Sequence, residues 1–366
     1  MAVRKRLSLI MLLLVLVGAV AAVVAWVGWK DIHEPYKGYD GAEQFVTVRQ
    51  GASSAEIGRA LAEAHIVREP RLLRGALWWT GQGRNLKAGE YRFDRALTPL
   101  EVIGVLARGE VYERRLTIPE GLTIQEMSKL YESHGIGRAR DFVEAARRVE
   151  RISDLDPDAR DLEGYLFPET YSLPKDASAS RLIDAMVDRF RAVYGEEMRA
   201  RTAVQGMNAR QVVTLASLIE KETGRAEERP IVAAVYRNRL NVGMPMQADP
   251  TVVYALAKMN RYNGNIRRDD LALDSPYNTY KYPGLPPGPI ASPGKASLEA
   301  VLMPADVPYL YFVSRNDGSH AFARTLAEHS ANVRTFQVEF FRNQRATSRP
   351  TSASRGASRS SRVPAP

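Results

Sequence analysis

Cysteine is absent from this chain of 366 residues, and histidine is scarce, with five copies. The lack of cysteine excludes disulfides, thiolate metal sites, cysteine nucleophiles and lipid attachment to a cysteine. The histidines show no spacing typical of metal ligands, so the sequence predicts no metal site. Packing must therefore hold the core without covalent or metal cross-links.

Several catalytic signatures are missing as well. The chain has no G-x-S-x-G nucleophile elbow, no H-E-x-x-H zinc motif, no Walker loop and no G-x-G-x-x-G turn after a strand. These absences argue against the enzyme classes that depend on those motifs. Carboxylates remain the candidates for acid–base chemistry.

The folded middle of the chain lacks a charge excess. The whole sequence has 51 basic and 42 acidic residues, which gives +9. Four basic residues lie in 1–30 and six arginines lie in 342–366, and neither segment has an acid. Without those ten, 41 basic residues stand against 42 acidic ones. No nucleic-acid partner is predicted, because the basic charge sits at the two ends.

One long apolar run is present near the start. Residues 7–29 span roughly 30 Å of hydrocarbon as a helix, enough to cross a membrane once. Arg4, Lys5 and Arg6 precede the run, so residues 1–6 are predicted to stay in the cytoplasm. A cleaved signal peptide is the alternative, because Ala19-Val-Ala21 suits a peptidase. The run continues past these alanines, which favours an uncleaved anchor.

A small module is predicted at 44–114, after a linker at 30–43. The element order is strand, helix, helix, strand, as in LysM-like sugar-binding modules, although no signature residue is shared. The predicted elements are Gln44–Arg49, Ser53–Ala64, Glu69–Thr80 and Glu90–Phe93. A shift of 70 residues aligns Ser53 and Glu56 with Thr123 and Glu126. Both pairs have the spacing of a capping box at a helix start.

Residues 115–342 are predicted to form a mixed, mostly helical domain, so the fold class is α+β. The helices and strand nearest the candidate chemistry are Asn208–Thr223, Glu227–Leu240, Pro250–Met259, Tyr309–Ser314 and Thr325–Phe341. Prolines in 261–308 stiffen a long loop, which favours an ordered functional surface. The Ser, Arg, Ala and Pro content of 343–366 predicts a disordered tail.

Two glutamates flank the apolar face of the helix at 208–223. Glu220 lies beside small and apolar residues, where partial burial would raise its pKa, as a general acid needs. The alternative is a structural glutamate paired with Lys221 or Arg225. Glu222 points about 160° away from Glu220, so the two cannot act together on one substrate. Spacing alone does not rank them. Thr214 and Ser217 are expected to face away from the core.

Six segments in order resemble one family, the YceG-like endolytic murein transglycosylases, also called MltG. They are Glu163–Tyr171 (EGYLFPETY), Leu215–Thr223 (LASLIEKET), Val235–Leu240 (VYRNRL), Met246–Tyr254 (MQADPTVVY), Tyr277–Tyr280 (YNTY) and Gly284–Gly294 (GLPPGPIASPG). They span about 130 residues, and the apolar run and the LysM-like region extend the likeness over most of the chain.

The resemblance implies roles for particular residues. The family's catalytic acid is the first glutamate of its A-S-x-x-E-K-E-T motif, which is Glu220 here. Tyr280 and the loop around Asn278 are implied to hold the sugar chain. Gln247 is implied to bind substrate as well. Asp249 lies in the same motif, but the proline that follows it favours a role as helix N-cap.

The resemblance also implies an activity. Such an enzyme cleaves MurNAc–GlcNAc β-1,4 bonds within peptidoglycan strands and leaves 1,6-anhydroMurNAc ends, with no cofactor. One carboxyl suffices, because the sugar's own C6 hydroxyl attacks the anomeric carbon. The implied location is the bacterial cytoplasmic membrane with the catalytic domain outside, near peptidoglycan synthases as possible partners. The alternatives are a non-catalytic, membrane-tethered peptidoglycan-binding scaffold and a muramidase that retains or inverts configuration.

Overall fold

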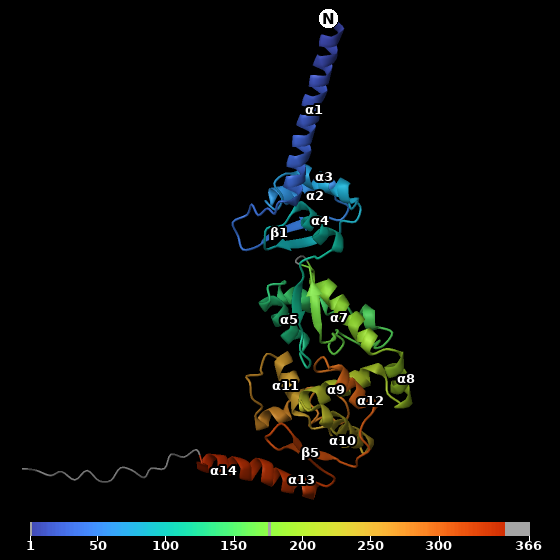
Figure 1. Ribbon diagram of the computed structural model, residues 1–366. Helices are drawn as coiled ribbons and strands as arrows, with labels where there is room; N and C mark the ends of the chain where they lie inside the picture. The colour runs from blue at the N-terminus through green and yellow to red at the C-terminus, as the bar shows by residue number, and fades with distance from the viewer. Residues whose placement is uncertain (1, 175–176, 348–366) are drawn as a thin grey trace, which may run out of the picture. The chain divides into compact units, whose positions relative to one another are not determined.

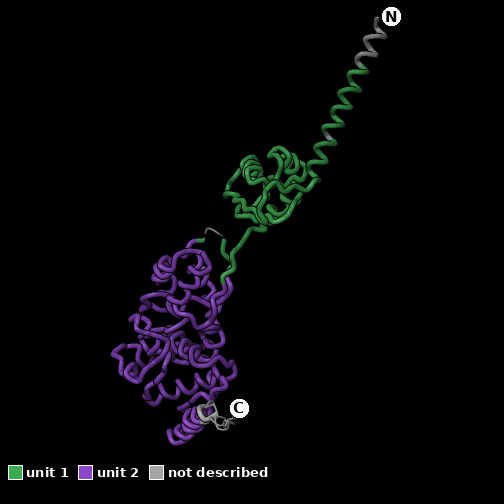
Figure 2. The backbone as a smooth tube through the Cα atoms, turned by 90° about the vertical axis from the view of Figure 1, so that its left-hand side faces the viewer, with its two compact units in different colours: residues 1–116, 172–177 green, residues 117–171, 178–366 purple. Residues whose placement is uncertain are grey.

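The computed structural model describes residues 2–174 and 177–347 as a mixed α+β protein (Figure 1). The chain divides into two compact units, residues 1–116 with 172–177 and residues 117–171 with 178–366 (Figure 2). Three two-stranded sheets pair β1 (Gln44–Val48) with β2 (Gly89–Phe93), β3 (Arg114–Thr117) with β4 (Thr170–Leu173), and β5 (Tyr311–Ser314) with β6 (His320–Ala323). The α+β class predicted from the sequence is confirmed.

The first unit contains the predicted strand–helix–helix–strand order. Its elements are α1 (Ala2–His33), β1 (Gln44–Val48), α2 (Ser54–Glu63), α3 (Pro70–Thr80), β2 (Gly89–Phe93) and α4 (Pro99–Arg108). β1 and β2 are antiparallel, with Gln44 opposite Phe93 and Val48 opposite Gly89. The helix α4 was not predicted. The LysM-like, sugar-binding assignment of this module stays a prediction.

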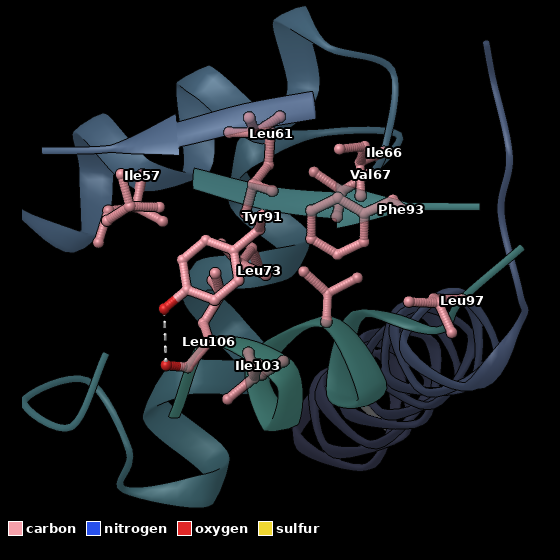
Figure 3. Close-up of a cluster of buried hydrophobic side chains, with 14 of the residues drawn as sticks. Ile57, Leu61, Ile66, Val67, Leu73, Tyr91, Phe93, Leu97, Ile103 and Leu106 are labelled. Atoms are coloured by element: carbon pink, nitrogen blue, oxygen red, sulfur yellow. Dashed lines mark hydrogen bonds between the residues drawn. The ribbon is translucent and has the colours of Figure 1, made fainter. Parts of the chain in front are cut away.

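One apolar core holds this unit together (Figure 3). Leu61 of α2, Leu73 of α3 and Leu106 of α4 meet Tyr91 and Phe93 of β2, and all five side chains are buried. The Tyr91 hydroxyl donates to the Leu106 carbonyl at 3.3 Å and to the Lys87 carbonyl at 2.7 Å. A buried hydroxyl without such partners would cost stability. The core therefore fixes these three helices against the sheet.

Both predicted capping boxes are confirmed. The Ser53 hydroxyl accepts from the Glu56 backbone N–H at 3.3 Å, and Glu56 accepts from the Ser53 N–H at 2.8 Å. Thr123 and Glu126 make the same pair of bonds, at 3.2 and 2.8 Å. These side chains satisfy N–H groups that the first helical turn leaves without partners. Local sequence alone therefore sets the starts of α2 and α5.

The helix α1 is long and apolar enough to cross a membrane. Its candidate span is Met11–His33, and the 18-residue window within it that meets the criterion has a mean hydropathy of 2.7 and is not buried inside the protein. The predicted span of 7–29 lies within α1. Helix α1 contacts α3 and α4, and Ile32, at the C-terminal end of α1, packs against the core of the first unit. The helix therefore ends against a folded module.

The second unit is mostly helical, and α9 lies among its other helices. Its elements are α5 (Ile124–Ser133), α6 (Ala139–Ala145), η1 (Val149–Ile152), α7 (Ala179–Val193), α8 (Glu196–Val204), α9 (Ala209–Glu222), η2 (Ala226–Glu228), α10 (Arg229–Asn241), α11 (Asp249–Lys258), η3 (Arg268–Ala272), α12 (Lys295–Leu302), β5 (Tyr311–Ser314), β6 (His320–Ala323), α13 (Leu326–Val333), η4 (Arg334–Glu339) and α14 (Phe340–Thr347). The predicted helices at 208–223, 227–240 and 250–259 are confirmed as α9, α10 and α11.

The expectation that Thr214 and Ser217 face away from the core is wrong. Both side chains are buried, because α8, α10, α11 and α12 all contact α9. The Ser217 hydroxyl accepts from the Ile290 backbone N–H at 3.1 Å and donates to the Thr214 carbonyl at 2.7 Å. Helix α12 interrupts the predicted loop at 261–308. These contacts come from distant sequence, so helical periodicity did not reveal them.

The end of the described chain also differs from the prediction. The predicted helix at 325–341 consists of α13, the π-helical segment η4 and α14. The prediction of a disordered tail beginning at residue 343 is wrong at its start, because α14 continues to Thr347. The rest of that predicted tail, 348–366, lies outside the described residues.

Gly164 offers a test of the packing around α9. It has φ +83°, and a Cβ there would lie 2.5 Å from Cβ of Pro289 and 2.8 Å from Cγ1 of Val213. Gly164→Ala should therefore lower the free energy of unfolding by about 2–3 kcal/mol, from backbone strain together with overpacking. Thermal melts of both proteins would measure this, with Gly206→Ala as control, since Gly206 has a similar φ of +65° and nothing within 4 Å. Equal losses would assign the whole effect to backbone strain.

Candidate active site

Helix α9 fixes the two candidate glutamates. It begins at the Asn208 cap, where Gln211 completes a capping box, and it ends at Glu222. Every residue from Val212 to Ile219 is buried. A helix packed on all sides has little freedom to turn, so each glutamate meets a defined set of neighbours. Those neighbours distinguish the two carboxyl groups.

Three hydrogen bonds fix the carboxylate of Glu220. Its side chain is only 6% exposed. Oε2 accepts from the Gly294 backbone N–H at 2.9 Å and from the Ser297 hydroxyl at 2.8 Å. Oε1 accepts from Nη2 of Arg229 at 3.3 Å. Both oxygens are therefore occupied, and the carboxylate joins α9 to α10 and to the start of α12.

This arrangement matches the structural alternative for Glu220, but with a different cation. Lys221 instead donates to the Gly121 carbonyl at 3.1 Å, and Arg225 donates to the Asp317 carbonyl at 3.0 Å. The partner is Arg229, the first residue of α10. The catalytic role of Glu220 stays a prediction, and the geometry does not favour it.

Glu222 has the surroundings of a general acid. The residue is half-buried. The Tyr236 hydroxyl donates to Oε1 at 2.7 Å, and it is the sole hydrogen-bond donor to this carboxyl among the described residues. Burial raises the pKa of Glu222 to about 7, and the negative charge of Asp249 also raises it. The hydrogen bond from Tyr236 and the positive charge of Arg239 lower the same pKa. At neutral pH a large fraction of Glu222 therefore carries a proton, and Oε2 has no partner within the described chain.

Tyr280 and Asp249 form a pair near Glu222. The Tyr280 hydroxyl donates to Oδ1 of Asp249 at 2.5 Å. Burial is the largest cause that raises the pKa of Tyr280, and the charges of Asp249 and Glu222 add to it. The mutual electrostatic effects place these three groups in one neighbourhood. The motif at 246–254 and the motif at 277–280 therefore both converge on Glu222.

The N-cap role predicted for Asp249 is wrong by one residue. The N-cap of α11 is Ala248, and Asp249 and Pro250 are its first two helical residues. The Asp249 side chain makes no cap hydrogen bond and instead accepts from Tyr280. A carboxylate in the first turn is still favoured by the helix dipole. Its position is therefore stable and leaves its charge near Glu222.

Gln247 is exposed and has an unusual backbone conformation. Its φ is +50°, and its N–H donates to the Thr279 carbonyl at 3.2 Å. Its side chain makes no hydrogen bond to any described residue. Non-glycine residues with positive φ are uncommon and gather at functional sites. The structure thus presents a free amide close in sequence to Asp249, as the predicted substrate-binding role requires.

Asn278 is fully buried inside the loop that carries Tyr280. Its Nδ2 donates to the carbonyls of Leu271 and Leu273 at 3.0 and 2.8 Å. Its Oδ1 accepts from the Tyr280 N–H at 3.0 Å. These hydrogen bonds fix the shape of the loop. They therefore suit a role of Asn278 in positioning Tyr280 better than a role in contacting substrate.

Tyr236 is the partner that sequence reasoning missed. It is buried on α10, and its ring packs edge-on against Phe312 at 5.9 Å. The only sequence signal for Tyr236 was its position in the VYRNRL motif, and that motif did not indicate what the residue does. Arg239, one turn later on α10, is held by the Leu310 carbonyl at 2.7 Å and lowers the pKa of Glu222. Tyr236 and Arg239 together connect Glu222 to the sheet of β5 and β6.

A second buried acid supports this scaffold without facing substrate. Glu163 accepts from the Ile124 N–H at 3.0 Å and from the Tyr254 hydroxyl at 3.2 Å. Burial, the largest cause, raises its pKa to about 8. It connects the start of α5 to α11. Glu163 is buried, so it is a poor candidate for contact with a glycan.

Two cavities, of about 410 and 400 Å³, are lined entirely by residues of the first unit. The first is lined by Gln82, Asn85, Lys87, Gly104, Ala107 and Arg108. Neither cavity touches Glu220 or Glu222. The candidate active site is therefore assigned from the surroundings of Glu222 and not from a cavity.

Fold and site together define an α+β protein with a half-buried carboxyl acid at the end of a central helix, a site suited to proton transfer. The profile of the YceG-like family matches residues 46–335. The chain belongs to this family, and the resemblance drawn from its motifs is confirmed.

Curated relatives carry the name endolytic murein transglycosylase. The protein of Bacillus subtilis (strain 168) is 30% identical over 301 residues, which cover 78% of this chain and 82% of that protein. The protein of Streptococcus pneumoniae (strain R6) is 29% identical over 327 residues, which cover 80% of this chain and 58% of that protein. The name is that of a lytic transglycosylase, the enzyme class expected from the sequence.

A crystal structure shares the fold. It is that of a YceG-like protein from Listeria monocytogenes, with 29% identity and a TM-score of 0.55. The match covers 79% of this chain and 98% of the Listeria chain.

Proposed function

We propose that this protein is a membrane-anchored endolytic murein transglycosylase that cleaves MurNAc–GlcNAc β-1,4 bonds within peptidoglycan strands. The names of the curated relatives support the substrate class. The observation that carries the chemistry is the raised pKa of Glu222, about 7, on a half-buried carboxyl with one free oxygen. Glu222 is therefore the acid proposed here, and Glu220, which the family resemblance implies, stays the alternative.

The reaction needs one group that gives and then takes a proton. Neutral Glu222 protonates the oxygen that links the two sugars, and the C1–O bond breaks. The Glu222 carboxylate then takes the proton of the muramic acid C6 hydroxyl as its oxygen bonds to C1. The products are a 1,6-anhydro end and a free hydroxyl on the released sugar, and no water is consumed. The attacking hydroxyl is already tethered, which supplies proximity.

Neighbouring residues have supporting roles in this proposal. Tyr236 holds Oε1 of Glu222, so that Oε2 faces the substrate. Tyr280 and Gln247 contact the glycan, since the first is half-exposed and the second has a free amide. Asn278 positions Tyr280 through its three hydrogen bonds. No cofactor is required for this chemistry.

A muramidase is the second candidate, because a second acid lies in the same neighbourhood. The charge of Asp249 acts on Glu222. Retaining and inverting glycosidases use two carboxyl groups across the scissile bond. Asp249 already accepts a 2.5 Å hydrogen bond from Tyr280, which occupies one of its oxygens. This occupation favours the single-acid route over hydrolysis.

The proposed location is the bacterial cytoplasmic membrane. Helix α1 supports a single-pass anchor by its length and composition. Arg4, Lys5 and Arg6 favour a cytoplasmic N-terminus and therefore an extracytoplasmic catalytic unit. An anchored enzyme of this kind meets strands as membrane synthases extend them, so we propose that it terminates their elongation. The LysM-like module is proposed to bind the glycan.

Product ends test the reaction. Digestion of isolated sacculi by the full-length protein in detergent should release fragments that end in 1,6-anhydroMurNAc. Such an end is lighter than a reducing end by one water molecule, so mass spectrometry separates lyase from hydrolase. Reducing ends alone would support the muramidase. Glycan binding without any cleavage would support the scaffold.

A further inference from the structure

Two adjacent tryptophans stand out on the surface of the first unit. Trp78 is 84% exposed and Trp79 is 77% exposed. Both lie in the last turns of α3, whose opposite face buries Leu73, Ala76 and Leu77 in the core. Single exposed apolar side chains are ordinary, but two large indole rings side by side indicate a surface with a partner.

Two cations share this outer face of α3. Arg71, Arg74 and Trp78 follow the i, i+3, i+7 spacing of one helical face, and both arginines are exposed. Neither guanidinium pairs with an acid or donates a hydrogen bond to another described residue. The outer face of α3 is thus aromatic at its C-terminal end and basic along its length, as in helices that lie at a membrane surface.

The place of α3 within the first unit points to the same partner. Helix α1 contacts α3 as well as α4, and Figure 1 shows α3 beside the end of α1. Trp26 and Trp29 of α1 are themselves exposed. Indole rings prefer the level of the lipid headgroups. If α1 spans the bilayer, its folded end holds α3 next to that level.

We propose that the outer face of α3 is a second membrane contact, in which Trp78 and Trp79 enter the headgroup layer while Arg71 and Arg74 meet anionic lipid phosphates. This contact rests on the proposed anchoring by α1 and does not depend on the proposed cleavage. It holds the LysM-like module against the membrane surface rather than letting it swing on the helix. A lipid surface is favoured over a glycan because α3 contacts the apolar helix α1 and its outer face carries two cations without acidic partners.

The four tryptophans of the chain permit a direct test. The double variant W26F/W29F leaves Trp78 and Trp79 as the only tryptophans. The full-length variant is placed in nanodiscs that contain phosphatidylglycerol, with or without lipids brominated near the headgroup. We expect the emission to shift to the blue relative to detergent and to be quenched by the brominated lipids. Aqueous iodide should quench it less in nanodiscs than it quenches the unfolded chain.

A charge variant separates lipid contact from general exposure. Adding R71Q/R74Q should reduce quenching by brominated lipid, and more so in anionic than in zwitterionic nanodiscs. The matched control is R261Q/R268Q, which removes the same charge from two exposed arginines of the second unit and should leave the quenching unchanged.

Three results would overturn the contact. Emission typical of water with full access to iodide would show that the tryptophans are free. Protection that appears only after soluble glycan strands are added would assign the face to the glycan. Absence of the chain from the nanodisc fraction would remove the anchor and the contact together. Digestion of sacculi by the same samples reports cleavage separately, so failure of the proposed function is distinguishable from each.

Discussion

Replacing Glu222 by Gln should reduce release of anhydro-ended glycans by at least about 10²- to 10⁴-fold, the range for loss of general acid–base catalysis. The change keeps the size of the side chain and the acceptor for the Tyr236 hydroxyl at 2.7 Å. It removes the one proton that the proposed reaction gives and then takes. Because Glu222, with a pKa of about 7, already carries a proton in about half of the molecules at pH 7, the neutral amide should leave the melting temperature near that of the wild type. Mass spectrometry of sacculus digests, with a thermal melt, measures both.

The pH dependence gives this prediction a readout that a structural role would not move. Burial raises the pKa of Glu222 to about 7, so the acid form exists below that pH and is lost above it. The rate of cleavage should therefore fall as pH rises through about 7, because the first step needs the proton. A rate that stays constant from pH 6 to 9 would exclude Glu222 as the acid.

Glu220→Gln is the matched control, since it makes the same change two residues earlier on the same helix. We expect it to retain most of the cleavage at temperatures where it is folded. Loss of cleavage in a folded Glu220→Gln, with Glu222→Gln active, would restore the assignment made from the motif. Full cleavage by both folded variants would reject both glutamates of this helix as the acid.

Local sequence predicted the features that depend on neighbours in the chain. The capping boxes at Ser53 and Thr123 each involve side chains three residues apart, so the sequence contains all the participants. The same holds for the alternating strands and for the apolar run of α1. Helix ends shifted by one or two residues, and the one-residue shift at Asp249 changed its role from cap to partner of Tyr280.

The ranking of the two glutamates needed the fold. Gly294 and Ser297, which occupy Glu220, lie more than 70 residues away in the sequence, and Tyr236 lies on the next helix. Periodicity placed both acids at the edge of an apolar face and gave no reason to separate them. The pKa of a carboxyl depends on burial and nearby charge, which non-local packing decides. For the same reason the sequence did not reveal that Ser217 is buried.

Removing the Glu220 side chain should destabilise the protein more than any other change proposed here. Glu220→Ala leaves the Arg229 guanidinium, only 11% exposed, without its closest acid, and leaves the Gly294 N–H and the Ser297 hydroxyl without this acceptor. Nε of Arg229 is also buried with no partner in the described chain. Breaking a buried ion pair from one side costs about 3–5 kcal/mol. Thermal and urea unfolding of the full-length protein in detergent would measure the loss.

Glu120 supplies the matched control, because it also faces Arg229. Its carboxyl lies 3.8 Å from Nη2 of Arg229, but its side chain is 47% exposed. Solvent screens such a pair, so Glu120→Ala should cost about 1 kcal/mol or less. Glu220→Gln should fall between the two alanine variants, since an amide still accepts from Gly294 and Ser297 but does not balance the Arg229 charge. Equal stability of Glu220→Ala and wild type would show that this carboxylate does not hold α9 to α10 and α12, and would remove the physical reason for preferring Glu222 as the free acid.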